Sequence, residues 1–174
     1  MKKSLLAGCL SMFLACTFCA AAETVLDDDF STNAPDSGVP AGWKTYQQGP
    51  ETGDVTVRRE GNVNVLYFND VCGKSEIGIT RDLSAVSGKY YRLTAEIGDL
   101  SGVDLNKSAP ALQLRFMKRP QNSVYNVRVS PGKTAVATGQ ADADALRIYL
   151  FTMRSGRAKM TVKRIKLEVS DKPF

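Results

Sequence analysis

The sequence has 174 residues, with 23 basic and 18 acidic side chains, a formal net charge of +5 and no histidine. The missing histidine excludes Ser-His-Asp and Cys-His catalysis, histidine metal ligands and imidazole acid–base chemistry. An enzyme with this composition would have to use carboxylates, lysine or tyrosine.

The N-terminal segment has the pattern of an export signal. Lys2 and Lys3 precede an apolar run over residues 5–18, and small alanines at 20–22 precede Glu23. A basic start, an apolar stretch and a small-residue exit are typical of a secretory signal peptide. The run is shorter than the about 20 residues that a membrane span needs. We therefore predict a signal peptide over 1–22 and a secreted mature domain over 23–174, in the periplasm or outside the cell.

Cysteine usage agrees with this division. Cys9, Cys16 and Cys19 all lie in the predicted leader, so Cys72 is the one cysteine of the mature domain and no intrachain disulfide can form there. We expect Cys72 to be buried, as cysteine often is. Cys16 follows a small-residue box and offers an alternative, a lipid anchor, but soluble export is favoured.

Short strand-like runs, separated by Gly, Pro, Asn, Asp and Ser, fill the chain from residue 54 onward. The run 89–99 alternates most strictly, with Tyr91 and Leu93 on one side and Tyr90 and Arg92 on the other. Such alternation indicates a half-buried strand. The predicted strands are 54–60, 63–68, 75–81, 89–99, 109–117, 123–129, 133–138, 145–152 and 158–169.

The segments between these strands also carry expectations. Residues 31–50, which include Trp43, are predicted to form a long opening loop that Trp43 anchors to one end of the domain. Residues 141–145 are predicted to form one helical turn. Apolar residues in the last strand change phase at Lys163 and Arg164, which predicts a β-bulge. Regularly spaced short strands in a chain of this length favour an all-β fold. We predict a single two-sheet antiparallel β-sandwich of the jelly-roll type.

Five motifs then suggest a family. In chain order they are residues 28–30 (DDF), 39–43 (VPAGW), 88–97 (GKYYRLTAEI), 145–150 (ALRIYL) and 162–167 (VKRIKL). In this order the chain resembles the galactose-binding-like jelly rolls, particularly the carbohydrate-binding modules attached to bacterial polysaccharide-degrading enzymes. The resemblance implies a β-sandwich that binds glycans without cutting them.

The resemblance also implies a structural calcium in many members. Its usual ligands are a carboxylate just after the first Phe and another on the last strand. Here Ser31 follows Phe30, and Lys163 and Arg164 occupy the second place. Calcium prefers several carboxylate and carbonyl oxygens, so we expect neither this metal nor another cofactor. The acidic residues 27–29 could offer oxygens, but a solvated acidic edge is the simpler interpretation.

Sugar binding needs flat aromatic faces, which stack on the ring, and polar groups, which fix its hydroxyls. Outward positions of the predicted strands supply both kinds of group, and Tyr46 lies in the opening loop. If these strands share a sheet, they form one polar–aromatic surface; alternatively, Tyr149 and Phe151 belong to the core. The candidate residues are Tyr46, Tyr90, Arg92, Gln113, Arg115, Arg147 and Tyr149, with Phe151 beside them.

Three functions stay open at this stage. The first is a secreted, non-catalytic carbohydrate-binding domain that recognises a glycan or polysaccharide. The second is a structural or adhesive β-sandwich that contacts other proteins at the cell surface. The third is a small jelly-roll glycosidase or lyase, for which Glu76, Glu96 and Asp99 are the candidate carboxylates. We expect no nucleic-acid partner, because no motif supports one and the basic residues over 154–166 suit solvated strand faces.

Overall fold

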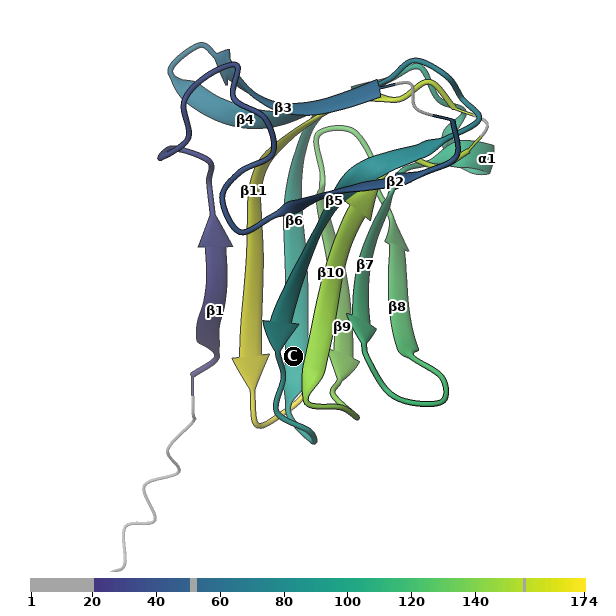
Figure 1. Cartoon of the computed structure of the whole chain (residues 1–174). Helices are drawn as coiled ribbons and strands as arrows, with labels where there is room; N and C mark the ends of the chain where they lie inside the picture. Colours follow the sequence, from purple (N-terminus) through teal and green to yellow (C-terminus); the bar gives the residue numbers. More distant parts are fainter. Residues whose placement is uncertain (1–20, 51–52, 155) are drawn as a thin grey trace, which may run out of the picture.

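The computed structural model describes residues 21–50, 53–154 and 156–174, in which two antiparallel sheets lie face to face (Figure 1). Most of the predicted signal peptide, with Cys16, lies outside the described residues. Within these ranges the chain forms eleven strands and one short helix, α1 (Leu105–Ser108). The predicted all-β sandwich is therefore confirmed.

The first sheet has the strand order β3-β4-β11-β6-β9. Strand β1 also pairs with β11, beyond the residues of β11 that pair with β4. Its strands are β1 (Glu23–Asp28), β3 (Gly53–Glu60), β4 (Val63–Asp70), β6 (Tyr90–Ser101), β9 (Thr134–Gln140) and β11 (Lys159–Ser170).

The second sheet has the order β2-β5-β10-β7-β8 and forms the front layer in Figure 1. Strand β10 is its centre and pairs with β5 on one side and β7 on the other. Its strands are β2 (Lys44–Gln48), β5 (Glu76–Ser84), β7 (Ala111–Phe116), β8 (Ser123–Arg128) and β10 (Ala145–Phe151).

Alternating side chains build the core between the two sheets. In β6, Tyr91 and Leu93 are buried while Tyr90 and Arg92 stay partly exposed, as the alternation predicts. In β10, the side chains of Leu146, Ile148 and Leu150 enter the same core. Because successive side chains point to opposite faces, the residues between them must face outward, and these outward residues form the candidate surfaces.

Some local predictions were wrong. The opening loop contains a strand, β2, which lies at the edge of the second sheet, and β1 precedes it. Residues 141–145 form no helical turn, because the backbone of Ala141 instead bonds to Lys89 and Gly88. The helix forms at α1, where the Asp104 side chain accepts the Asn106 N–H. Cys72 is half-buried rather than buried.

Two other predictions were confirmed. The register of β11 against β6 shifts between Met160 and Val162 and again between Val162 and Arg164, which is the predicted bulge. Trp43 is buried in the core, and its indole Nε1–H donates to Asp28 Oδ2 at 2.9 Å. Trp43 therefore anchors the segment before β2 to the end of β1.

Several hydrogen bonds hold the chain after β1 against the first sheet, among them backbone bonds of Asp36 and Ser37 to Val57 on β3 and two bonds from the side-chain amide of Asn64. Phe30 is fully buried and has a φ of 61°, which is uncommon for a residue with a side chain. The Asn64 side-chain amide, on β4, donates to the carbonyls of Phe30 at 3.1 Å and Asn33 at 2.8 Å. Asn64 thus helps to fix the turn that brings the chain from the first sheet towards the second.

Replacing this amide should loosen the turn. We expect Asn64→Ala to lower the free energy of unfolding by about 1–3 kcal/mol, because it strips two carbonyls of a partner. Chemical denaturation of the two purified proteins measures the difference. Asn62→Ala, on the exposed turn two residues earlier, is the matched control and should change stability by less than about 0.5 kcal/mol. Equal effects of the two substitutions would contradict the role of Asn64.

Candidate functional site

The outer face of the second sheet gathers five of the seven predicted site residues. We call it the second-sheet face and define it by the outward residues of β2, β5, β10, β7 and β8. The strand registers place the predicted residues there together with several that the prediction missed. The predicted members are Tyr46, Gln113, Arg115, Arg147 and Tyr149; the others are Lys44, Glu76, Asp82, Asn126 and Arg128, with Phe151 beside them.

The register aligns these residues in rows across the strands. Tyr149 lies opposite Gln113, which in turn lies opposite Asn126. In the neighbouring row, Arg147 lies between Asp82 and Arg115. With neighbouring strands about 4.8 Å apart, a row over five strands spans about 19 Å. The face is thus wide enough to meet an extended ligand along its length.

Three aromatic rings form a cluster on this face, separate from the core. The Tyr46 ring lies edge-on to Tyr149 and to Phe151, with centroid distances of 5.3 and 5.4 Å. Gly78 lies beside Tyr46 and Phe151 in the sheet, and a Cβ there would come within 2.6 Å of Phe151 Cβ. A glycine is therefore required where these two rings meet.

Most of this aromatic cluster is covered by neighbouring side chains, and we call its two buried rings, Tyr149 and Phe151, the aromatic floor of the face. Tyr149 is 7% exposed and Phe151 is 8% exposed, while Tyr46 is half-buried. The Arg115 guanidinium lies over the Tyr149 ring, 4.7 Å from its centroid. A ligand on this face would therefore meet polar groups and the Tyr46 ring before it met Tyr149.

Charged groups above the floor are partly paired. Arg147 donates to Asp82 and, at 3.3 Å, to the Tyr149 hydroxyl, and Lys44 pairs with Asp82 at 3.3 Å. The hydrogen bond from Arg147 is the main reason that the pKa of Asp82 lies below its ordinary value. Asp82 is thus ionised and fully engaged. Arg115 instead donates twice to the Gln113 side-chain oxygen, at 3.1 and 2.6 Å.

The edge of the face carries a second carboxylate. Glu76 accepts the Tyr46 hydroxyl at 2.8 Å and lies 3.7 Å from Arg154. Burial, and then the hydrogen bond to Glu76, raise the pKa of Tyr46 to about 12. Tyr46 therefore stays protonated and holds its ring against the aromatic floor.

Tyr90 and Arg92 do not belong to this face. Both project from β6, on the outer side of the first sheet, so the condition for a single shared surface, that the candidate strands lie in one sheet, is not met for these two. Arg92 pairs with Glu168 at 2.8 Å and lies over the Phe174 ring, 4.3 Å from its centroid. The alternation of apolar and polar residues along a strand predicts whether a residue points to the core or to solvent. It does not predict which of the two sheets contains the strand.

Asn126 and Arg128 were missed although the sequence contained a signal for them. Alternation in 123–129 placed Tyr125 and Val127 on the inner side, which leaves Asn126 and Arg128 outside. The structure confirms this: both are exposed on β8, and Asn126 lies opposite Gln113. Lys44 could not be found in this way, because its strand was read as a loop.

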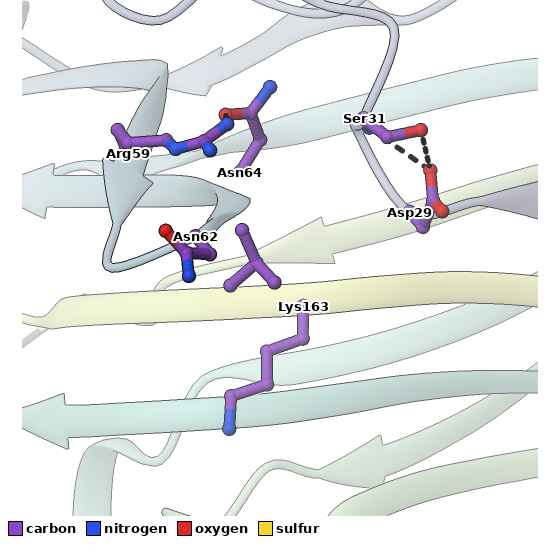
Figure 2. A pocket seen from close by; sticks show the side chains of 7 residues that line it. Asp29, Ser31, Arg59, Asn62, Asn64 and Lys163 are labelled. Carbon is purple, nitrogen blue, oxygen red and sulfur yellow. Dashed lines mark hydrogen bonds between the residues drawn. The ribbon is translucent and has the colours of Figure 1, made fainter.

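A hollow of about 230 Å³ lies elsewhere, between the chain after β1, the β3–β4 turn and β11 (Figure 2). Several of its polar groups already have partners: Ser31 donates to Asp29 at 2.6 Å, and Arg59 donates to the Gly61 carbonyl at 3.2 Å and to Asn64 Oδ1 at 3.4 Å. Lys163 extends away from these side chains in Figure 2. The lining groups do not converge on a common point, so we do not assign the site here.

The residues around the start of this segment show whether the protein has ligands for the structural calcium that the resemblance implies. Both Asp27 carboxylate oxygens accept from Arg164, at 2.6 and 2.5 Å, and this bonding lowers the pKa of Asp27. The carbonyls of Phe30 and Asn33 are taken by Asn64. The described residues contain no group of three or more Cys, Asp or Glu side chains that could hold a metal ion. This donor set does not fit a calcium ion.

The candidate carboxylates for hydrolysis are separated by the sandwich. Glu76 lies on the outer face of the second sheet, whereas Glu96 and Asp99 lie on β6 of the first sheet. A glycosidase needs its two carboxyl groups about 5–10 Å apart across one bond, and packed sheets alone are about 10 Å apart. Glu76 therefore cannot form such a pair with either of the others.

Comparison with solved structures finds proteins with a similar fold. A xylan-binding domain, CBM22-1 from Paenibacillus barcinonensis Xyn10C, has a TM-score of 0.57 at 13% identity over 88% of this chain and 98% of that one. The CBM1 domain of BiXyn10A has a TM-score of 0.55 at 13% identity, over 83% and 97%. This chain shares the β-sandwich fold of these two domains.

Parts of larger enzymes share the same sandwich. The arabinose-bound MgGH51 α-L-arabinofuranosidase gives a TM-score of 0.55 at 13% identity, over 81% of this chain and 25% of that one. The enzymatically active domain of tailspike protein 4 from bacteriophage CBA120 gives 0.53 at 12%, over 71% and 19%. This chain therefore spans only about a fifth to a quarter of those enzymes. No family model and no curated protein matches the sequence.

One finding bears on the membrane. Among the described residues, no helix has the length and apolar character needed to cross a bilayer.

The engagement of Asp27 by Arg164, and of the Phe30 and Asn33 carbonyls by Asn64, leads to a prediction about calcium. We expect excess EDTA, or added calcium, to leave the unfolding temperature of the protein unchanged within about 1 °C, since nothing that binds only the folded state is removed or supplied. Differential scanning calorimetry measures this. A calcium-dependent rise of several degrees would show that the loop after β1 holds a metal after all.

The burial of the Tyr46 hydroxyl, together with its bond to Glu76, predicts a stability loss at high pH. An unfolded tyrosine has a pKa of about 10, below the value of about 12 in the folded protein. The folded state therefore binds more protons between these values, and stability falls as the pH rises through this window. Denaturation of the wild type and Tyr46→Phe from pH 8 to 11.5 tests this. The wild type should lose more stability; parallel curves would contradict the shift.

Proposed function

We propose that this protein is a secreted, non-catalytic module that binds a glycan on the second-sheet face. One observation carries the proposal: strands β7 and β10 bring Gln113, Arg115 and Arg147 together on one face, beside the partly exposed ring of Tyr46 on β2, which belongs to the aromatic cluster of this face. Guanidinium and amide groups are the donors and acceptors that fix sugar hydroxyls, and a partly exposed ring can pack against a sugar. The carbohydrate-binding modules with the same fold support this reading.

The face suits a chain-like ligand better than a small molecule. Its polar groups are distributed over the five strands rather than gathered in a cavity. The floor beneath them is rigid, because Tyr149 and Phe151 are packed by their neighbours. A polysaccharide could therefore lie across the strands and contact several rows at once, while little of the protein would have to become ordered.

The protein–protein alternative has less support. It requires a large exposed apolar patch, whereas the exposed large apolar residues of the described chain come from eight separate positions. They are Val25, Val63, Val71, Val86, Leu105, Val124, Val136 and Phe174.

Two matched substitutions distinguish the two outer faces. Tyr46 and Tyr90 are both half-buried tyrosines, but Tyr46 lies on the second-sheet face and Tyr90 on the opposite one. We expect Tyr46→Ala to weaken polysaccharide binding about tenfold, as the loss of an interface aromatic does, and Tyr90→Ala to leave it unchanged. Affinity electrophoresis against a panel of soluble plant, bacterial and animal polysaccharides measures both.

Other results would redirect the proposal. The reverse order of the two variants would move the site to the first sheet. No binding to any polysaccharide would remove the proposed function. Release of reducing ends from a bound polysaccharide would show that the protein is an enzyme.

A further inference from the structure

Two arginines lie directly opposite each other on the second-sheet face. Arg147 on β10 is the cross-strand partner of Arg115 on β7. Like charges in this position destabilise a sheet. On its other side Arg147 has Asp82, which neutralises it. Among the described residues no carboxylate pairs with Arg115, which bonds to the neutral Gln113 and lies over Tyr149, so its positive charge is not offset.

The positive charge of the face is concentrated on one side. The outward positions of its strands carry four cationic residues, Lys44, Arg115, Arg128 and Arg147, against two carboxylates, Glu76 and Asp82. Both carboxylates lie on β5 and are engaged by neighbouring side chains. Towards β7 and β8 the balance is therefore positive.

Arg115 and Arg128 are the two cations of that side. Among residues 21–50, 53–154 and 156–174, no carboxylate lies within 4 Å of either guanidinium. Arg115 bonds to the neutral Gln113, and Arg128 to the Asn106 carbonyl at 3.1 Å. Neutral acceptors leave the full positive charge of both groups in place. Their remaining N–H donors can reach a ligand.

The aromatic floor makes these cations the first groups that a ligand meets. Tyr149 and Phe151 are more than nine-tenths buried, and the Arg115 guanidinium covers Tyr149. Stacking of sugar rings on an open aromatic face therefore cannot dominate recognition here. A planar guanidinium held against a ring has a fixed orientation and presents its fork of donors to planar anions such as carboxylates.

We propose that the second-sheet face recognises an anionic glycan, one whose sugars carry carboxylate groups, with Arg115 and Arg128 as the groups that bind these carboxylates. This inference rests on the proposed function, because it names the class of glycan for the same face. Arg115 and Arg128 lie on adjacent strands, separated along β8 by about 13 Å. Exposed Asn126 lies between them and can bond to hydroxyls.

The test compares the same polysaccharide with and without its charge. Polygalacturonan, glucuronoxylan and alginate are offered to the whole mature protein by affinity electrophoresis, each before and after chemical reduction of its carboxyl groups to alcohols. We expect at least one of the acidic samples to bind, and its reduced form to bind at least tenfold more weakly. Added salt should weaken binding of the acidic form in particular.

Two arginine variants locate the interaction. Arg115→Gln should weaken binding of the acidic form about tenfold and leave binding of the reduced form unchanged. The matched control is Arg58→Gln, since Arg58 also lies over a tyrosine, 3.7 Å from the Tyr67 centroid, but on the first sheet. Arg128→Gln is a second test variant, at an exposed position, should Arg115→Gln fail to fold.

Each outcome decides between the two proposals. Equal binding of the acidic and reduced forms, with no effect of Arg115→Gln or Arg128→Gln, would overturn the anionic class and leave glycan binding intact. Loss of binding in Arg58→Gln but not in Arg115→Gln would overturn the assignment to this face. No binding of any acidic, reduced or neutral polysaccharide would overturn both.

Discussion

Strand β10 is packed on both of its faces, and this double burial determines the rest of the second sheet. Leu146, Ile148 and Leu150 enter the core between the sheets, while Tyr149 and Phe151 pack under the outer surface. A slip of one residue would exchange these two sets. The register with β5 and β7 is therefore strongly determined, and with it the positions of the charged groups above the aromatic floor.

Gly78 shows how closely the fold and the surface are linked. It leaves room for Tyr46 and Phe151 to meet, so the edge strand β2 is held to the sheet by rings as well as by backbone hydrogen bonds. Tyr46 also bonds to Glu76, a carboxylate whose negative charge is offset by Arg154 at 3.7 Å. Tyr46 thus takes part both in the packing of the edge and in the polar contacts of the face.

Most strands could be predicted from the alternation of apolar and polar residues alone. The sheet to which each strand belongs could not. The pattern in β6 correctly placed Tyr90 outward, yet nothing local distinguishes an outward residue of one sheet from that of the other. Strand β2 was missed because four of its five residues are exposed at an edge, which removes the alternating signal. The burial of Tyr149, and the position of Arg115 over it, depend on neighbouring strands, which local patterns do not reveal.

The turn after β1 is held in part by a neutral group, the Asn64 amide, which donates to the carbonyls of Phe30 and Asn33. An amide does not titrate, cannot be chelated and is not exchanged with ions of the surroundings. The two hydrogen bonds that this amide makes therefore come entirely from the chain itself, and neither a chelator nor a change in the ions of the medium removes the group that donates them.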